Sequence, residues 1–408
     1  MKKFCIIMLA LLMVSGARAQ WVSLNSGTTH TLNSVYFTDV NTGYAVGDSG
    51  TILKTSDGGL NWISQYLGIS ANVYSVHFPV ADTGYAGISY YTFAKTTDGG
   101  LNWIILNYPP NPFEPFYNFV FSIFFTDSET GYNSGSYYNR YVHYDFIQRT
   151  TNGGDTTWET QYWGSDWSFN SIFFPEKDTG FAVGCDAAIL HTTNGVDWVS
   201  QSSGTTKCLN SVYFFNVSTG YIVGDSGIIL KTTDGGINWT FQNSGGWNTL
   251  HSVRFFNESI GYAVGDNGTI LKTCDGGNFW LALYSGTSVN LYSVFLTDAD
   301  TVYVVGQNGT ILKTTTGGLP LGTNNQSLTK ESIKIFPNPS SSIITISTPT
   351  TSNKNTFMTI YNISGQVILS RQITEPIINV DVAGLPQGVY FVKVTDDRTV
   401  QVGKFVKQ

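Results

Sequence analysis

Residues 54–62 read KTSDGGLNW, and altered copies of this stretch recur through the sequence as far as residue 318. Most copies contain a basic residue, a Thr, an Asp or Asn, a Gly and a final Trp. The tryptophans stand at positions 21, 62, 103, 158, 198, 239 and 280, so that most copies are 40 or 41 residues apart. A repeat of about 40 residues indicates stacked supersecondary units.

Each unit contains four short runs of β-branched and aromatic residues. In the first unit they occupy residues 33–37, 43–47 and 51–55 and the segment that follows Trp62. Turn residues such as 48–50 (DSG) separate the runs and favour tight hairpins. Four antiparallel strands repeated around an axis predict an all-β fold, the β-propeller.

The number of blades follows from the first run of each unit, which contains a serine. These serines are Ser34, Ser75, Ser122, Ser171, Ser211, Ser252 and Ser293, and they predict seven blades. The seventh unit ends near residue 318 without a Trp, whereas Trp21 stands alone before the first unit. We therefore expect residues 21–24 to supply the outer strand of the last blade, which closes the ring and removes its open edges.

The repeated pattern Thr-x-Asp-x-Gly-x-x-Trp resembles the Asp-box of BNR-type propellers. Because GYAVG occurs in the same unit, at residues 43–47, the chain looks most like the photosystem II assembly-factor family of seven-bladed propellers. The resemblance covers residues 21–318, and we assign the propeller to residues 20–318. It implies a non-catalytic scaffold that binds another macromolecule.

The resemblance also implies a structural role for the box residues. The Asp carboxylate can accept hydrogen bonds from amides of its own hairpin, Gly supplies positive φ angles, and Trp packs between blades. Asn replaces Asp at two positions, where the motif is also one residue longer or shorter, and Asn can make similar bonds. The six box positions are Asp57, Asp98, Asn152, Asn194, Asp234 and Asp275.

A basic residue stands just before each box. These residues are Lys54, Lys95, Arg149, His191, Lys231, Lys272 and Lys313. One interpretation is a ring of cations that grips an anionic partner. The alternative, which we favour, is that each residue pairs with acceptors near the hairpin while its aliphatic stem covers apolar surface.

The third unit departs from the repeat in two places. Six extra residues fall within 108–117 and seven within 134–144, and we expect both insertions to rise as loops on the face away from the boxes. The second unit has two tyrosines, Tyr90 and Tyr91, at the equivalent turn without a change of length. The predicted aromatic patch comprises Tyr90, Tyr91, Phe113, Tyr117, Tyr137, Tyr138, Arg140, Tyr141, His143 and Tyr144.

The aromatic patch has two interpretations. Loops on a rigid scaffold are common binding sites, and aromatic rings beside charges suit a sugar or a protein hot spot. Alternatively, the two insertions only pack on each other and shield their own rings. We keep the binding patch as a hypothesis.

The composition changes after the propeller. Residues 319–330 form a polar linker, and residues 331–408 contain seven short runs of alternating apolar and polar residues, which predict a small Ig-like β-sandwich. The stretches FPNP at 336–339 and LPQGVYFV at 385–392 closely resemble the type A C-terminal sorting domain of the type IX secretion system. In that family the machinery recognises this domain, which is usually removed, and the cargo is released or attached to surface lipopolysaccharide.

The N-terminal sequence and the composition constrain the location of the protein and the class of its partners. Residues 1–19 show the three-part pattern of a secretory signal peptide, whose apolar part is too short to span a bilayer, and no later segment is long enough. The three remaining cysteines are an odd number, so we expect the packed core to supply most of the stability. The formal charge of −7, without a basic cluster, argues against nucleic acid as a partner. We expect a secreted or cell-surface monomer without a cofactor.

Asp-boxes also occur in sialidases and xyloglucan-cleaving propellers, so the resemblance admits a catalytic role. A sialidase site needs clustered arginines, and the predicted propeller contains only Arg140, Arg149 and Arg254. Glu114 and Asp145 could form a general acid/base pair, but only their proximity supports this. The histidines show no metal-ligand spacing. We therefore predict a scaffold that binds an extracellular protein or glycan, with a glycan-binding or glycan-cleaving surface protein as the alternative.

Overall fold

The computed structural model describes residues 21–89, 92–107, 117–138, 143–155, 157–164, 168–318, 333–347, 356–362, 367–395 and 400–408. The described residues fall into two compact units, 21–318 and 333–408. Residues 1–20 and 319–332, which contain the predicted signal peptide and linker, lie outside the described residues.

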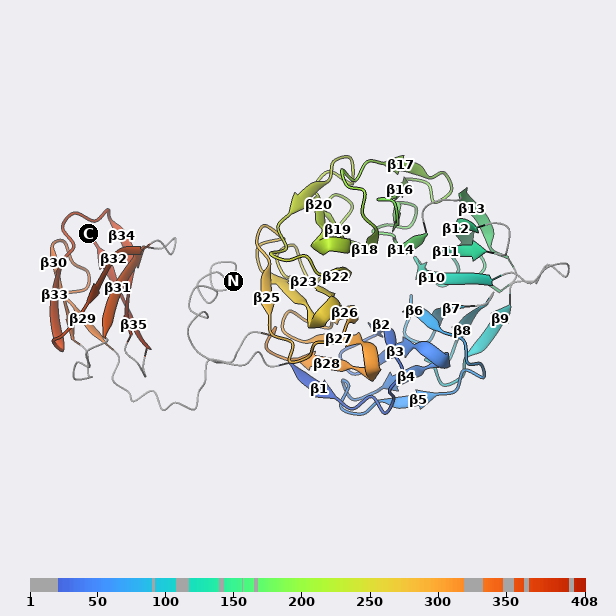
Figure 1. The fold of residues 1–408 in the computed structure, drawn as a ribbon, viewed down its shortest axis with the longest axis horizontal. Helices are drawn as coiled ribbons and strands as arrows, with labels where there is room; N and C mark the ends of the chain where they lie inside the picture. Colours follow the sequence, from blue (N-terminus) through green and yellow to red (C-terminus); the bar gives the residue numbers. More distant parts are fainter. Residues whose placement is uncertain are drawn as a thin grey trace. The chain divides into compact units, whose positions relative to one another are not determined.

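The first unit is a ring of seven four-stranded antiparallel sheets, which confirms the predicted seven-bladed propeller (Figure 1). Blade one contains β2 (Leu32–Phe37), β3 (Gly43–Gly47), β4 (Ile52–Thr55) and β5 (Ile63–Gln65). Blade two contains β6 (Val73–His77), β7 (Gly84–Ile88), β8 (Thr92–Thr96) and β9 (Ile104–Asn107). Blade three contains β10 (Tyr117–Phe125), β11 (Gly131–Tyr138), β12 (His143–Thr150) and β13 (Glu159–Gly164). Blade four contains β14 (Phe169–Phe173), β15 (Gly180–Gly184), β16 (Ile189–Thr192) and β17 (Val199–Gln201).

The remaining blades follow the same order. Blade five contains β18 (Leu209–Phe214), β19 (Gly220–Gly224), β20 (Ile229–Thr232) and β21 (Thr240–Gln242). Blade six contains β22 (Leu250–Phe255), β23 (Gly261–Gly265), β24 (Ile270–Thr273) and β25 (Leu281–Leu283). Blade seven contains β26 (Leu291–Leu296), β27 (Val302–Gly306), β28 (Ile311–Thr314) and β1 (Val22–Leu24). In the part of the ring that the structure describes, four single 3-10 turns lie between second and third strands: η1 (Asp48–Gly50), η2 (Asp225–Gly227), η3 (Asp266–Gly268) and η4 (Gln307–Gly309).

The position of a strand in its blade explains its sequence. The first strand of each blade lies nearest the axis and the fourth lies at the circumference (Figure 1). All five residues of β3 are buried because neighbouring blades cover both faces of the sheet, so the run is apolar without alternation. Glycine is required at both ends of β3 because neighbouring atoms leave no room for a Cβ. A Cβ on Gly43 would lie 2.5 Å from the Phe37 ring, and one on Gly47 would lie 1.9 Å from the Thr31 carbonyl oxygen.

The ring closes through β1, which comes from the start of the propeller sequence. Val22 pairs with Lys313 and Leu24 with Ile311, so β1 becomes the outer strand of blade seven, beside the orange β28 in Figure 1. This is the closure that the lone Trp21 predicts. Trp21 itself is buried in the core between blades six and seven.

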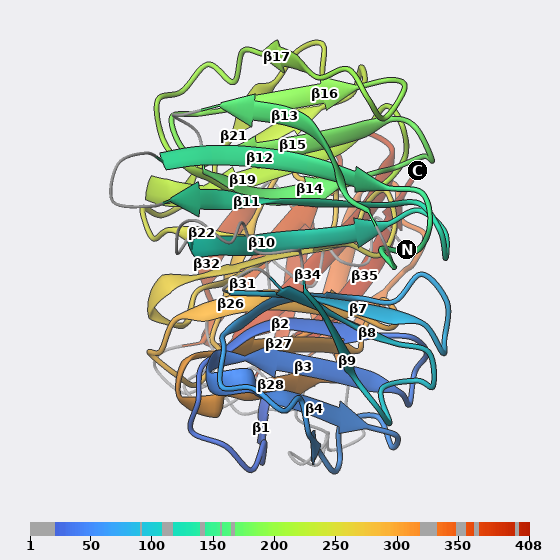
Figure 2. The ribbon, with the colours of Figure 1, turned by 90° about the vertical axis from the view of Figure 1, so that its right-hand side faces the viewer.

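Blade three is longer than the others. β11 and β12 contain eight residues each, whereas β3 contains five and β4 four (Figure 2). The prediction of a loop over residues 134–144 was therefore wrong for most of that stretch. Tyr137 pairs with Tyr144 and Tyr138 with His143, because side chains with high β propensity continue the hairpin.

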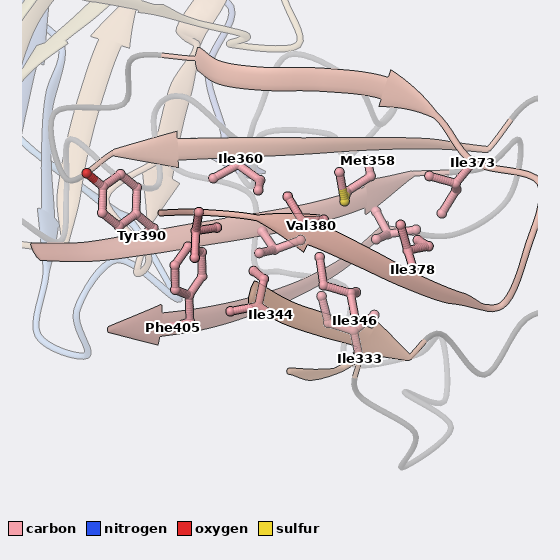
Figure 3. Packing of buried hydrophobic residues seen from close by; sticks show 13 residues of the cluster. Ile333, Ile344, Ile346, Met358, Ile360, Ile373, Ile378, Val380, Tyr390 and Phe405 are labelled. Carbon is pink, nitrogen blue, oxygen red and sulfur yellow. The ribbon is translucent and has the colours of Figure 1, made fainter. Parts of the chain in front are cut away.

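The second unit is a sandwich of seven strands, as the sequence predicts. One sheet contains β29 (Lys334–Phe336), β30 (Ile343–Ser347) and β33 (Ile377–Asp381), in that order. The other contains β32 (Val367–Gln372), β31 (Phe357–Asn362), β34 (Gly388–Thr395) and β35 (Val400–Lys407). Apolar side chains of both sheets meet in the core, where Ile344 and Ile346 face Ile360 and Met358 (Figure 3).

Candidate binding surface and the comparisons

The carboxylates of the Asp-boxes bond within their own hairpins. Asp57 Oδ1 accepts hydrogen bonds from the Thr55 hydroxyl (2.9 Å) and the Asn61 N–H (2.9 Å), and Oδ2 accepts one from the Asn61 amide (2.7 Å). The same three bonds recur around Asp98 and Asp234. Because these donors favour the ionised form, led by the backbone N–H of Asn102, the pKa of Asp98 falls to about 2. Such contacts fit the structural role expected of the boxes.

The remaining box positions use similar bonds. Asn152 and Asn194 each accept a hydrogen bond from the Thr two residues earlier, at 2.8 and 3.2 Å. Asp275 accepts one from Thr273 at 2.9 Å and another from the Phe279 N–H at 3.0 Å.

Four of the basic residues before the boxes, Lys54, Lys231, Lys272 and Lys313, donate to the box of the next blade. Lys313 Nζ donates to the Gly58 carbonyl oxygen at 2.7 Å, and the Tyr303 hydroxyl donates to the same oxygen at 2.8 Å. The ammonium group also lies 5.1 Å from the centre of the Tyr303 ring. Equivalent Lys and Tyr pairs hold the glycine carbonyls of the boxes in blades two, six and seven. These contacts tie neighbouring blades together.

Three junctions lack this contact among the described residues. Between blades two and three, Lys95 Nζ donates to Asp155 Oδ1 at 2.6 Å and the Tyr85 hydroxyl donates to the Ser128 carbonyl oxygen at 3.1 Å.

At the junction of blades three and four, the box of blade four is one residue shorter than the others. The Tyr132 hydroxyl of blade three has no hydrogen bond of good geometry among the described residues. The Arg149 guanidinium lies over the Tyr132 ring. Blade four carries Phe181 at the tyrosine position, so it has no hydroxyl to donate to blade five. A disulfide between Cys185 and Cys208 links blades four and five instead.

Two aromatic clusters form on blade three. Adjacent residues of a strand point to opposite faces of the sheet, so Tyr137 and Tyr138 separate. Tyr137 and Tyr144 join Trp163 of β13, whose ring centre lies 5.0 Å from that of Tyr144 and 5.6 Å from that of Tyr137. We call Tyr137, Tyr144 and Trp163 the outer cluster. Trp163 is 49% exposed.

The second cluster lies on the other face of the same sheet. Tyr138, which is 41% exposed, stacks on Phe119 with ring centres 5.5 Å apart. Phe119 stacks in turn on Phe121, and Tyr74 of blade two contacts both phenylalanines. We call Tyr74, Phe119, Phe121 and Tyr138 the inner cluster.

A polar group lies beneath the inner cluster. Asp145 is fully buried; its Oδ1 accepts a hydrogen bond from the Ser136 hydroxyl (2.6 Å) and lies 3.4 Å from His143 Nε2. The imidazole itself is about half exposed. A buried carboxylate held in this way can fix the long hairpin. Glu114, the other half of the predicted acid/base pair, lies outside the described residues.

The predicted patch is therefore only partly visible. Tyr137, Tyr138, His143 and Tyr144 are described with their side chains, but they divide between two faces, and Tyr117 is described as part of β10. Five predicted residues lie outside the described residues: Tyr90, Tyr91, Phe113, Arg140 and Tyr141. Sequence reasoning missed Trp163 and Phe119, which lie in strands flanking the insertions; the aromatic pair Tyr162-Trp163 was an available signal.

Within the described ranges, no group of three or more His, Cys, Asp and Glu side chains could hold a metal ion. In the same part of the chain, no helix has the length and apolar character that crossing a bilayer requires.

Comparison with protein families identifies the propeller. The family described as photosynthesis system II assembly factor YCF48 matches residues 14–111, 150–242 and 240–315, which together exceed half of the chain. The chain belongs to the YCF48 family. No curated protein matches it.

Solved structures show the same fold. YCF48 from Cyanidioschyzon merolae is 20% identical with a TM-score of 0.59, and the match covers 72% of this chain and 98% of that one. A structure titled YCF48 bound to D1 peptide gives the same identity and TM-score and covers 72% and 97%. The WD40 propeller domain of Doa1 is 11% identical, with a TM-score of 0.56 and coverage of 72% and 96%.

The second unit matches a different family. Residues 334–408 match the secretion system C-terminal sorting domain. Together with the YCF48-like propeller, this confirms the resemblance to a type IX sorting domain and indicates export with an outer-membrane or cell-surface fate.

Proposed function

We propose that the propeller is a non-catalytic scaffold that binds another macromolecule through blade three after export. The observation that carries this proposal is the pair of partly exposed aromatic clusters on the one blade whose strands are lengthened. A closed ring with repeated contacts between blades is a rigid support for such a surface.

Rigid aromatic side chains are suited to binding. Trp163 and Tyr138 expose large apolar area, and the neighbouring rings hold them in place. Because their rotamers are already restricted, little conformational entropy is lost when a partner covers them. Trp and Tyr are also enriched among the residues that dominate protein interfaces.

A protein is the favoured partner. The YCF48 structure bound to D1 peptide shows that a protein of this fold accommodates a polypeptide. A glycan is the second candidate, because the rings of Tyr144 and Trp163 lie only 33° from parallel and could stack on a sugar face. Asp145, the one described carboxylate of the predicted acid/base pair, is buried and hydrogen-bonded, which supports a binding role over hydrolysis.

Capture experiments with variants test the proposal. The full chain would be compared with the double variant Tyr144→Ala/Trp163→Ala, with Tyr138→Ala, and with Trp247→Ala, which removes a tryptophan that is 87% exposed outside blade three. Each protein would be immobilised and offered a surface extract of the producing cells, and a glycan array with a reducing-sugar assay would be run in parallel.

The outcomes separate the candidates. Capture by the wild-type protein and Trp247→Ala, but not by the blade-three variants, supports a protein partner. The same pattern on the array, without sugar release, supports a glycan. Equal capture by all variants contradicts the blade-three surface, and sugar release contradicts the non-catalytic role.

A further inference from the structure

The centre of the propeller contains a cavity of about 160 Å³. It is lined by residues of the first strands, which lie nearest the axis of the ring in Figure 1. Its side chains form three layers, which follow from the positions along each first strand. The mouth layer comprises Asn33, Tyr74, Phe121, Asn170, Asn210, His251 and Tyr292. The wall layer comprises Ser34, Ser75, Ser122, Ser171, Ser211, Ser252 and Ser293. The floor layer, toward the Asp-boxes, comprises Tyr36, His77, Phe124, Phe173, Tyr213, Arg254 and Phe295.

The floor is a closed ring of neighbouring side chains. Ring centres of successive aromatic members lie 4.6 to 5.2 Å apart, from Phe295 through Tyr36 and His77 to Tyr213. The Arg254 guanidinium completes the ring, 4.7 Å from the centre of Phe295 and 5.9 Å from that of Tyr213. The cavity therefore has a closed floor that contains one cation.

Arg254 has no counter-ion in this cavity. Among the described residues it forms no ion pair and no hydrogen bond, and the lining contains no Asp or Glu. The other titratable groups of the floor are neutral. Burial, together with the nearby Arg254, lowers the pKa of His77 to about 3, and burial raises the pKa values of Tyr36 and Tyr213. A guanidinium carries five N–H donors in a fixed fork, and here its aromatic neighbours offer no strong acceptor.

The wall adds further donors. Six of its serine oxygens accept a backbone N–H from the next blade, at 3.0 to 3.4 Å, as Ser75 does from Ile123. A hydroxyl that accepts one bond still has a proton to donate. Among the described residues, none of the seven wall hydroxyls donates a hydrogen bond, so these protons are available to a guest in the cavity.

The mouth is polar and carries its own carboxylates. Asn33 donates to Asp48 and Asn210 to Asp225, each at 3.1 Å, and His251 Nε2 lies 2.8 Å from Asp266 Oδ1. These carboxylates are engaged by mouth side chains and do not line the cavity. They lower the affinity for an anion but leave the donor-rich interior unchanged.

We propose that the central cavity binds a small free oxyanion, phosphate or sulfate, with Arg254 as the cationic ligand and the wall hydroxyls as additional donors. A cavity that offers many donors, one unpaired guanidinium and no carboxylate is complementary to an oxyanion, because charge-assisted bonds from guanidinium to oxyanions are strong. The mouth layer shares Tyr74 and Phe121 with the inner cluster, whereas Arg254 and the wall serines belong to neither aromatic cluster.

Calorimetric titration of the full chain with phosphate, sulfate and acetate, at constant ionic strength set with chloride, tests this site. Phosphate and sulfate are expected to bind more tightly than acetate, which has fewer acceptor oxygens. Arg254→Gln should weaken phosphate binding about tenfold or more, since a charge-assisted bond is lost. Lys177→Gln, which removes a cation that is 63% exposed outside the cavity, should bind as the wild-type protein does.

Two results would overturn the assignment. One is phosphate binding of equal affinity in a folded Arg254→Gln variant, and the other is no measurable binding by the wild-type protein. If Arg254→Gln does not fold, crystals of the wild-type chain grown with selenate decide the question. Anomalous density beside the guanidinium supports the site, and density only elsewhere contradicts it.

Discussion

Lys272 gives the most quantitative test of how the blades are joined. Its side chain is 4% exposed, and Nζ donates to the Gly317 carbonyl oxygen at 3.0 Å, above the ring of Tyr262. Burial lowers the pKa of this ammonium group from 10.5 to about 8, although Asp300 opposes the shift. A folded-state pKa below the unfolded value means that the charged lysine destabilises the propeller at neutral pH.

The sign and size of the pH dependence follow from this difference. Between the two pKa values the unfolded chain holds a proton that the folded protein has released, so stability rises with pH. From about pH 7.5 to about pH 9.5 the free energy of unfolding should rise by about 2 kcal/mol relative to Lys272→Met, which cannot titrate. The Tyr262 hydroxyl still donates to Gly317 in that variant, at 2.9 Å, so the junction keeps one bond.

Urea denaturation followed by tryptophan fluorescence would measure this effect. All ten tryptophans precede residue 319, so the signal reports the propeller and not the C-terminal sandwich. Lys177→Met, at a site that is 63% exposed, is the matched control and should show no such difference. If the free energies of unfolding of the wild-type protein and Lys272→Met differ by the same amount across this pH range, the buried-charge reasoning is refuted.

Two further predictions concern the same junctions. Tyr303→Phe should lower the free energy of unfolding by about 1 kcal/mol, because it removes the hydrogen bond to the Gly58 carbonyl oxygen. Tyr132→Phe should change the free energy of unfolding little, because the Tyr132 hydroxyl makes no such bond. Equal losses of the two variants in urea denaturation would contradict this assignment. Replacing both Cys185 and Cys208 with Ser should cost about 3 kcal/mol, given their sequence separation of 23 residues. An unchanged urea midpoint in that variant would show that the disulfide does not support the junction between blades four and five.

Much of the fold could be predicted because each repeated residue has one role. The period of the tryptophans and serines gives the blade number, and the unmatched Trp21 identifies the strand that closes the ring. The alternating runs after residue 331 predict the sandwich strands closely, since one face of each sheet is buried and the other exposed.

The candidate sites depend on contacts that repeat spacing does not show. Whether Tyr137 and Tyr138 share a face depends on whether the insertion is loop or strand, and strand pairing separates them. Lys313 bonds to Gly58 in the next blade, on a segment far away in sequence. Arg254 is an ordinary residue of one repeat. Its contacts with aromatic rings of other blades form only because the first strands of all seven blades meet at the axis.

Hydrogen exchange of the full chain, measured with and without the captured partner, tests the central claim most directly. Binding through blade three should protect amides of β11, β12 and β13 while the Asp-box hairpins exchange at their unbound rates. Protection confined to those hairpins, or spread evenly around the ring, would contradict blade three as the binding surface.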